Sequence, residues 1–157
     1  MKDLTKDNIN KIKYEDIIAI FVAEGGAMGE PNAFHAVLKD LTHYYVNLGD
    51  VNFTRQDFFK AFPLMESIRC SCGEVNNLED GWNWFNAGFG NYLIVRNEYY
   101  KSIKEYIEKN MSDNWQIGEL FNNWFSVLEK IIGSDNNGKI LFRKTFNDKK
   151  KWNNRIY

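Results

Sequence analysis

The sequence contains few of the residues that disulfide-rich or metal-stabilised folds need. It has two cysteines and two histidines among 157 residues. One residue separates Cys70 from Cys72, and so local a pair cannot form the disulfide framework of a secreted domain, so we expect reduced thiols. His35 and His43 could complete a four-ligand zinc set, but their spacing is outside that of zinc fingers. We therefore expect no metal and no cofactor.

Long apolar runs are also missing. No stretch approaches the roughly 18 to 20 apolar residues that span a bilayer. Charges interrupt the N-terminal MKDLTKDNINKIK, where a signal peptide has an apolar centre. These absences predict a cytoplasmic protein with no membrane partner. A chain of 157 residues can bury a core without disulfides or metals, so we expect a single domain over 1–157, with 1–13 and 147–157 flexible.

Patterns typical of strands occupy the first two thirds of the chain. The apolar run IIAIFVAE, residues 17–24, predicts a buried strand. Residues 33–48 place apolar side chains at helical spacing, but two aromatic and β-branched halves around KDLT favour a hairpin over a helix. WNWFNA and YLIVR flank GFGN and predict a second hairpin. Thr54 is expected to cap a short helix that ends before Pro63.

Helical patterns follow in the last third of the chain. Asn97 predicts the N-cap of a helix through EYYKSIKEYIEKN. A second helix is expected from near Asp113 to a C-cap at Gly133. Its predicted buried stripe consists of Ile117, Leu120, Phe121, Trp124, Leu128, Ile131 and Ile132. KILFRKTF resembles an edge strand. The order of patterns predicts an α+β fold, with an antiparallel sheet from residues 17–96 and the helix of residues 114–132 packed on it.

The net charge of -1 conceals a strong segregation of charge along the chain. Residues 14–90 carry four basic and eleven acidic side chains, whereas residues 139–157 carry seven basic side chains and one acidic. Charge of one sign concentrated in a segment creates a field that attracts partners of opposite charge. The acidic segment therefore predicts a surface for a basic protein, although a solvated acidic face would have the same composition. The basic end could attract the phosphates of a nucleic acid, but the acidic segment of the same chain would repel them, so we expect no nucleic-acid partner.

One candidate site combines carboxylates with tryptophans near the middle of the chain. Carboxylates can stand in for the phosphates that a basic partner binds, and tryptophan is enriched among the residues that contribute most to binding. The predicted partner-binding residues are Glu66, Glu74, Glu79, Asp80, Trp82 and Trp84. This set predicts an inhibitor that covers the active site or substrate-binding face of a basic toxin or nuclease.

The alternative candidate is a ligand-binding or enzymatic site around the glycine-rich EGGAMGEP. A glycine-rich turn after a strand can present backbone N–H groups to a phosphate, histidine can act as a general base, and arginine can bind an anion. The residues of this set are Glu24, Gly25, Gly26, Gly29, His35, His43 and Arg96. The turn lacks the Lys-Ser/Thr pair of a phosphate loop, and no nucleophile motif accompanies the histidines. We assign no catalytic residue and favour a binding protein over an enzyme.

Two segments resemble sequences of small bacterial proteins. They are EGGAMGEP, with its GAMG core, and GWNWFNAGFGNYLIVRNEYY, with its GNYLIVR run. The resemblance implies a shared fold, and the proteins that it indicates include immunity proteins of polymorphic toxin systems. It implies no catalytic residue. The resulting expectation is an immunity or antitoxin-like inhibitor, and a phage-encoded inhibitor of a bacterial nuclease would use the same surface.

Overall fold

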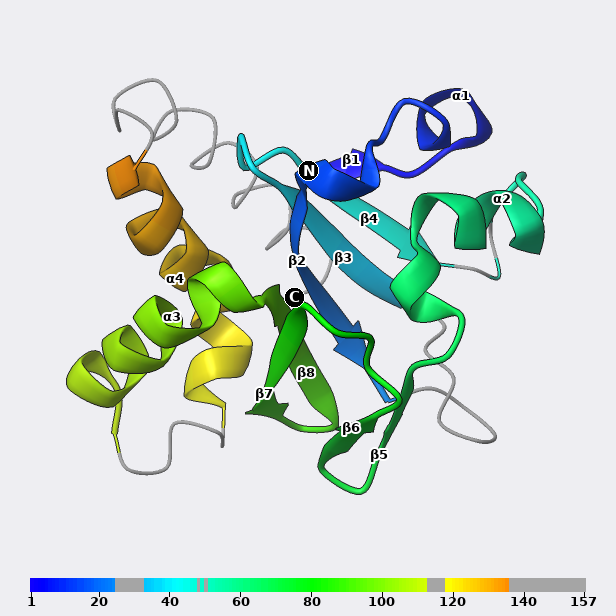
Figure 1. Ribbon diagram of the computed structural model, residues 1–157. Helices are drawn as coiled ribbons and strands as arrows, with labels where there is room; N and C mark the ends of the chain where they lie inside the picture. Colours follow the sequence, from blue (N-terminus) through cyan, green and yellow to red (C-terminus); the bar gives the residue numbers. More distant parts are fainter. Residues whose placement is uncertain (25–32, 48, 50, 113–117, 136–157) are drawn as a thin grey trace.

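The computed structural model describes residues 1–24, 33–47, 49, 51–112 and 118–135, which fold around a mixed sheet (Figure 1). The sheet has six strands in the order β1-β4-β3-β2-β8-β7. Their bounds are Lys2–Asp3 for β1, Ile17–Ala23 for β2, Ala33–Leu38 for β3, His43–Asn47 for β4, Trp82–Gly88 for β7 and Asn91–Arg96 for β8. The α+β class is confirmed. The sheet is not purely antiparallel, however, because β1 runs parallel to β4.

The remaining elements pack on the two faces of this sheet (Figure 1). They comprise helices α1 (Lys6–Ile9), α2 (Arg55–Ala61), α3 (Asn97–Asn110) and α4 (Glu119–Asp135), the short hairpin of β5 (Arg69–Ser71) and β6 (Glu74–Asn76), and 3₁₀ turns at Tyr14–Asp16 and Pro63–Met65. We call the side covered by α3 and α4 the α3–α4 face. The side covered by α1, α2 and the β5–β6 hairpin is the α2 face. None of the described helices has both the length and the apolar character needed to cross a bilayer.

Strand β2 lies inside the sheet and explains the apolar run of its sequence. It pairs antiparallel with β3 on one side and with β8 on the other. Its side chains alternate between two separate cores: Ile20 and Val22 are buried on the α2 face, and Ala19 and Phe21 on the α3–α4 face. A strand buried on both faces has no polar side, which is why no alternation is visible in the sequence.

Three local predictions are confirmed by the observed elements. Residues 33–47 form a hairpin of β3 and β4 rather than a helix, and β7 and β8 form the second hairpin. Thr54 caps α2: its Oγ1 accepts the Asp57 N–H at 3.1 Å, and the Asp57 carboxylate accepts the Thr54 N–H at 3.3 Å. This reciprocal pair satisfies two donors at the helix start. Helix α2 ends at Ala61, shortly before Pro63.

The predicted caps of the long helices are wrong. Asn97 is the first residue of α3, and Arg96 occupies the N-cap position without a side-chain cap. The Asn97 N–H donates to the carbonyl of Gly81 at 2.9 Å, so strand pairing continues up to the helix and leaves no capping turn. Gly133 lies within α4, which continues to Asp135, and it lacks the positive φ of a C-cap. Burial of the neighbouring Ile132 outweighs the cost of one helical glycine, about 1 kcal/mol.

The predicted stripe of α4 faces the sheet. Leu120, Trp124, Leu128 and Ile132 are buried, and Phe121 and Ile131 are half-buried. Ile117 and the predicted helix start at Asp113 lie outside the described residues, as do KILFRKTF and residues 147–157. Residues 1–13 contain β1 and α1 and bury both Leu4 and Ile9.

Candidate functional site

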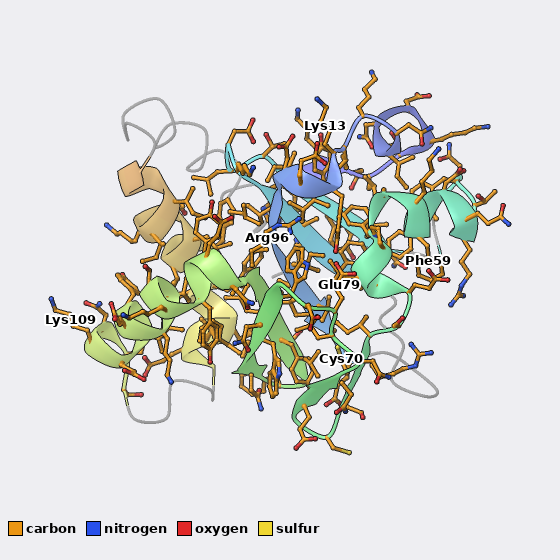
Figure 2. All side chains as sticks on the ribbon, in the orientation of Figure 1. Lys13, Phe59, Cys70, Glu79, Arg96 and Lys109 are labelled. Carbon is orange, nitrogen blue, oxygen red and sulfur yellow. The ribbon has the colours of Figure 1, made fainter. Side chains whose placement is uncertain are left out.

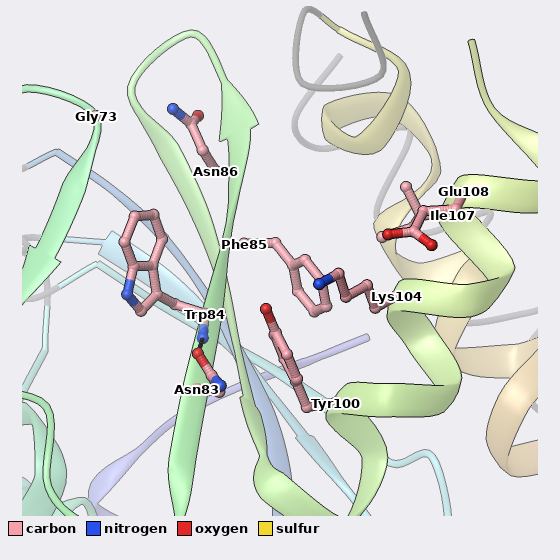
Figure 3. A pocket seen from close by; sticks show the side chains of 9 residues that line it. All are labelled: Gly73, Asn83, Trp84, Phe85, Asn86, Tyr100, Lys104, Ile107 and Glu108. Carbon is pink, nitrogen blue, oxygen red and sulfur yellow. Dashed lines mark hydrogen bonds between the residues drawn. The ribbon is translucent and has the colours of Figure 1, made fainter. Parts of the chain in front are cut away.

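A concave surface lies along β7, which ends the sheet among the described strands. A groove of about 480 Å³ follows this strand, between the turn of the β5–β6 hairpin and helix α3 (Figure 3). Its lining includes Gly73, Asn83, Trp84, Asn86, Tyr100 and Lys104. Trp84 and Tyr100 project on opposite sides of the strand in Figure 3. With Phe85, the groove therefore combines three aromatic rings, two side-chain amides and a strand edge.

The four predicted carboxylates are all exposed. Glu66 follows the turn Pro63–Met65, and Glu74 is the first residue of β6. Glu79 and Asp80 lie in the loop that leads into β7 (Figure 2 labels Glu79). Glu79 also accepts a hydrogen bond from the Tyr14 hydroxyl. Burial and this carboxylate raise the pKa of Tyr14, so the phenol stays protonated as the donor.

The two predicted tryptophans have different environments. Trp82 is only 6% exposed, and the Arg96 guanidinium lies 4.4 Å from its ring centroid. Arg96 is fixed further by donating to the carbonyls of Ile17 at 2.7 Å and Tyr14 at 2.6 Å. Trp82 is thus packed inside the protein and holds a structural arginine. Trp84 is half-buried and lines the groove, where a partner can reach it.

The two histidines meet across the β3–β4 hairpin. Nδ1 of His35 lies 2.8 Å from Nε2 of His43, so one nitrogen donates to the other. Both side chains are buried on the α3–α4 face, where His43 stacks on Phe125 at 4.8 Å and contacts Trp124 edge-on. Burial lowers the pKa of His43 to about 3. At neutral pH His43 is a neutral core residue enclosed by aromatic rings.

Glu24 lies on the other side of the sheet. Its carboxylate accepts a hydrogen bond from the Tyr92 hydroxyl at 2.5 Å, and that hydroxyl accepts the N–H of Gly73 at 3.0 Å. Tyr92 belongs to the core of the α2 face, as does Cys70. Burial, with a contribution from Glu24, raises the pKa of the Cys70 thiol to about 12. The thiol is therefore protonated and a poor nucleophile at neutral pH.

The described members of the alternative ligand set are not brought together. The histidine pair is on the α3–α4 face, Glu24 contacts the α2 face at one end of β2, and Arg96 binds the carbonyl of Ile17 at the other end. Gly25, Gly26 and Gly29 lie outside the described residues. Within the described part of the chain, no three histidine, cysteine or carboxylate side chains converge on a point where a metal could bind.

The groove residues on β7 and α3 were not identified from the sequence. Asn83 and Asn86 belong to a strand that the sequence did predict, and Tyr100 and Lys104 share one side of α3 at i, i+4 spacing. The available signal was the presence of two asparagines in the otherwise aromatic and apolar WNWFNA, since polar residues in a strand indicate positions that are not fully buried. Comparison of the chain with protein-family models, curated proteins and solved structures gives no significant match.

Proposed function

We propose that this protein is a binding protein that neutralises a basic protein, in the manner of an immunity protein or antitoxin, with a nuclease or another cationic toxin as its partner. The observation that supports this most directly is the position of Glu66, Glu74, Glu79 and Asp80. All four are exposed: Glu79 and Asp80 lead into β7, which carries the accessible ring of Trp84, Glu74 follows the Gly73 turn that lines the groove, and Glu66 follows the turn Pro63–Met65. Carboxylates of this kind can occupy the phosphate positions of a nuclease substrate.

The expected mechanism is electrostatic steering followed by exclusion of the substrate. An acidic surface raises the rate of encounter with a basic partner, and this gain is lost as salt screens the charges. Screening acts over about 8 Å at physiological ionic strength, so exposed carboxylates are strongly affected. Once docked, the inhibitor covers the substrate-binding face of the toxin and no chemical step is needed.

The state of the reactive side chains also favours binding over catalysis. His43 is neutral and enclosed, and the Cys70 thiol is buried with a raised pKa. The Tyr92 hydroxyl is hydrogen-bonded to Glu24 and Gly73, and burial raises its pKa as well. These groups stabilise the fold in their neutral forms and are not presented to a solution substrate.

Co-expression tests this function. Each open reading frame adjacent to the gene is expressed in a bacterial host with and without the protein, and growth is recorded. We expect one neighbour to arrest growth alone and to be tolerated when the protein is present. If every neighbour is harmless, or if the protein never restores growth, the proposed function is wrong.

The purified pair then tests the surface. The double variant Glu79→Lys/Asp80→Lys should lower the association rate about tenfold at low salt and flatten its dependence on salt, as measured by stopped-flow fluorescence. The matched control is Glu98→Lys/Glu105→Lys, which makes the same charge change at exposed positions of α3. Equal association rates for both double variants would contradict a role for the acidic surface.

A further inference from the structure

The register of the β7–β8 hairpin fixes which backbone groups of β7 point away from the sheet. The Asn97 N–H donates to the Gly81 carbonyl, and Asn83 is paired with Val95 in the same register. In an antiparallel ladder hydrogen-bonded pairs alternate with pairs that make no ladder bonds. The odd-numbered residues of β7 therefore exchange backbone hydrogen bonds with β8. The backbone N–H and C=O groups of Trp82, Trp84 and Asn86 point away from β8, toward the open edge of the sheet.

The environment of Trp84 agrees with this assignment. The backbone N–H of Trp84 donates a hydrogen bond of 2.9 Å to Oδ1 of the preceding residue, Asn83. Asn86 makes a similar bond to the N–H of Gly88 at 2.9 Å. Local asparagine bonds of this kind replace ladder bonds where no neighbouring strand supplies a carbonyl. They can be exchanged for bonds to an added strand by rotation of one side chain.

The edge lacks the usual protection against strand addition. Natural edge strands often carry a charged residue, especially lysine, or a proline, and either of these prevents pairing with another strand. The sequence of β7, WNWFNAG, contains no charged residue and no proline over seven residues. Its bulge lies at the far end, between Asn86 and Gly88, and leaves Trp82, Trp84 and Asn86 in register.

The shape of the groove favours a single extended segment as the occupant. Strand β7 lies between the Gly73 turn on one side and Tyr100, Lys104 and Glu108 of α3 on the other (Figure 3). Both walls stand beside the strand edge. A second copy of the chain, docked through its own β7, would bring its α3 and its Gly73 turn against the same elements of this copy. A single extended strand fits between the two walls, where it can form backbone hydrogen bonds and gain specificity from alternate side chains.

The charges around the groove indicate the chemistry of that segment. Glu108 belongs to one wall, and the exposed Glu74 follows Gly73 in the other. Asp80 lies in the loop that enters β7. Among the residues that the structure describes, Lys104 is the only basic side chain that lines the groove. A lysine or arginine on the incoming strand would meet these carboxylates and could lie over the accessible Trp84 ring.

We infer that β7 binds an extended, basic segment of the partner as an additional strand of the sheet, through the outward backbone groups of Trp82, Trp84 and Asn86. This inference rests on the proposed function, since it specifies which part of a basic partner is bound and how. Backbone hydrogen bonds hold the segment at the edge, and side-chain charge selects it.

The probe for the first experiment is a short synthetic peptide of alternating lysine and valine, titrated into the full chain with backbone amide NMR and hydrogen exchange as readouts. We expect the amides of Trp82, Trp84 and Asn86 to shift and to gain protection. A peptide with the same side chains but N-methylated alternate amides keeps the charge and loses the ladder donors. It should bind at least about fivefold more weakly, and a glutamate-valine peptide should not bind.

A pair of variants tests the same point from the protein side. Trp84→Pro removes one outward N–H and leaves the β8 ladder intact, and Trp84→Val removes the ring but keeps the N–H. We expect the proline variant to bind the lysine-valine peptide at least about fivefold more weakly than the valine variant. Amide protection of Leu93 and Val95 confirms that the hairpin is retained in both.

The outcomes separate this inference from the proposed function. Equal binding of the N-methylated and unmodified peptides to the wild-type protein would show attraction by charge alone and would overturn strand addition. Slow exchange of the outward β7 amides in the free protein would show that another segment of the chain already occupies the edge, with the same consequence. Growth rescue in the co-expression test is independent of both results, and its failure would reject the inhibitor role whatever the peptides do.

Discussion

The two faces of the sheet bury polar groups in different ways. On the α3–α4 face, His35 and His43 hydrogen-bond to each other inside a shell of aromatic rings. On the α2 face, polar groups lie at the two ends of β2, where Glu24 binds the Tyr92 hydroxyl and Arg96 binds backbone carbonyls. The stability of the α3–α4 face therefore depends on two histidines that stay neutral, and the stability of the α2 face depends on charged groups at its margins.

This difference predicts different sensitivities. A neutral buried pair loses stability when either member becomes charged, because the charge cannot be solvated. A marginal arginine or carboxylate keeps part of its hydration, so its loss removes hydrogen bonds and packing but does not leave a charge buried without a partner. The α3–α4 face should respond strongly to acid and to cavities, and the α2 face more weakly to single substitutions at its ends.

The largest effect is expected from Trp124→Ala on the α3–α4 face. Trp124 is fully buried and stacks on Phe21 with 4.7 Å between ring centroids and 4° between planes. Removing the ring should lower the free energy of unfolding by about 3 to 5 kcal/mol, measured by urea denaturation. Trp84→Ala is the control, since its ring is half-buried and lines the groove, and its cost should be clearly smaller. Equal costs would remove the distinction between the faces.

The next effect is a loss of stability in mild acid. His43 has a folded-state pKa of about 3, against an ordinary value of 6.5, because burial disfavours its cation. The unfolded chain therefore binds more protons between these values, so stability is complete above about pH 6.5 and falls as the pH decreases. Between pH 7 and pH 5 the free energy of unfolding should decrease by about 2 kcal/mol.

A double variant isolates the contribution of the histidine pair to this slope. His35→Leu/His43→Leu replaces both ring partners, so no buried imidazole remains without its hydrogen bond, and the loss between pH 7 and pH 5 should largely disappear. The measurement is urea denaturation of both proteins at several pH values. A wild-type stability that is flat over this range would contradict the neutral-pair interpretation of the α3–α4 face.

The smallest effect concerns Arg96 at the margin of the α2 face. Arg96→Lys keeps the charge but loses the planar group that lies over Trp82 and donates to two carbonyls. We expect a loss of about 1 kcal/mol in the free energy of unfolding. Arg55→Lys is the matched control, because Arg55 is exposed and lies over the ring of Phe59. A larger loss at Arg55 would show that the stacking geometry at Arg96 contributes nothing specific.

Much of the fold could be predicted from the sequence because its signals are local. The turns KDLT and GFGN separate strand patterns within a few residues, and the Thr54 capping pair spans three positions. The parallel strand β1 could not be predicted, since Lys2 and Asp3 have no strand pattern and acquire their place only through β4. The N-cap of α3 was predicted at Asn97 instead of Arg96, because the start of this helix depends on the pairing of Asn97 with Gly81 across the hairpin.

The exposed residues of the candidate site could be predicted from the sequence, whereas the residues whose burial depends on packing against other elements could not. Polar loop positions such as Glu79 and Asp80 are exposed, as their composition suggests. Trp82 was expected to face a partner, but a ring can equally be covered from within, and Arg96 covers this one from the neighbouring strand. The strand edge of β7 was invisible because strand order is a property of the whole sheet.

The central position of β2 also has a kinetic consequence. The β3–β4 and β7–β8 hairpins join residues close in sequence, but β2 pairs with β8 across a long span, Ile20 opposite Ile94. Closing so long a loop has an entropic cost that no contact offsets until the two halves meet. Both hairpins should therefore form early during folding, and the joining of β2 to β8 should set the overall rate.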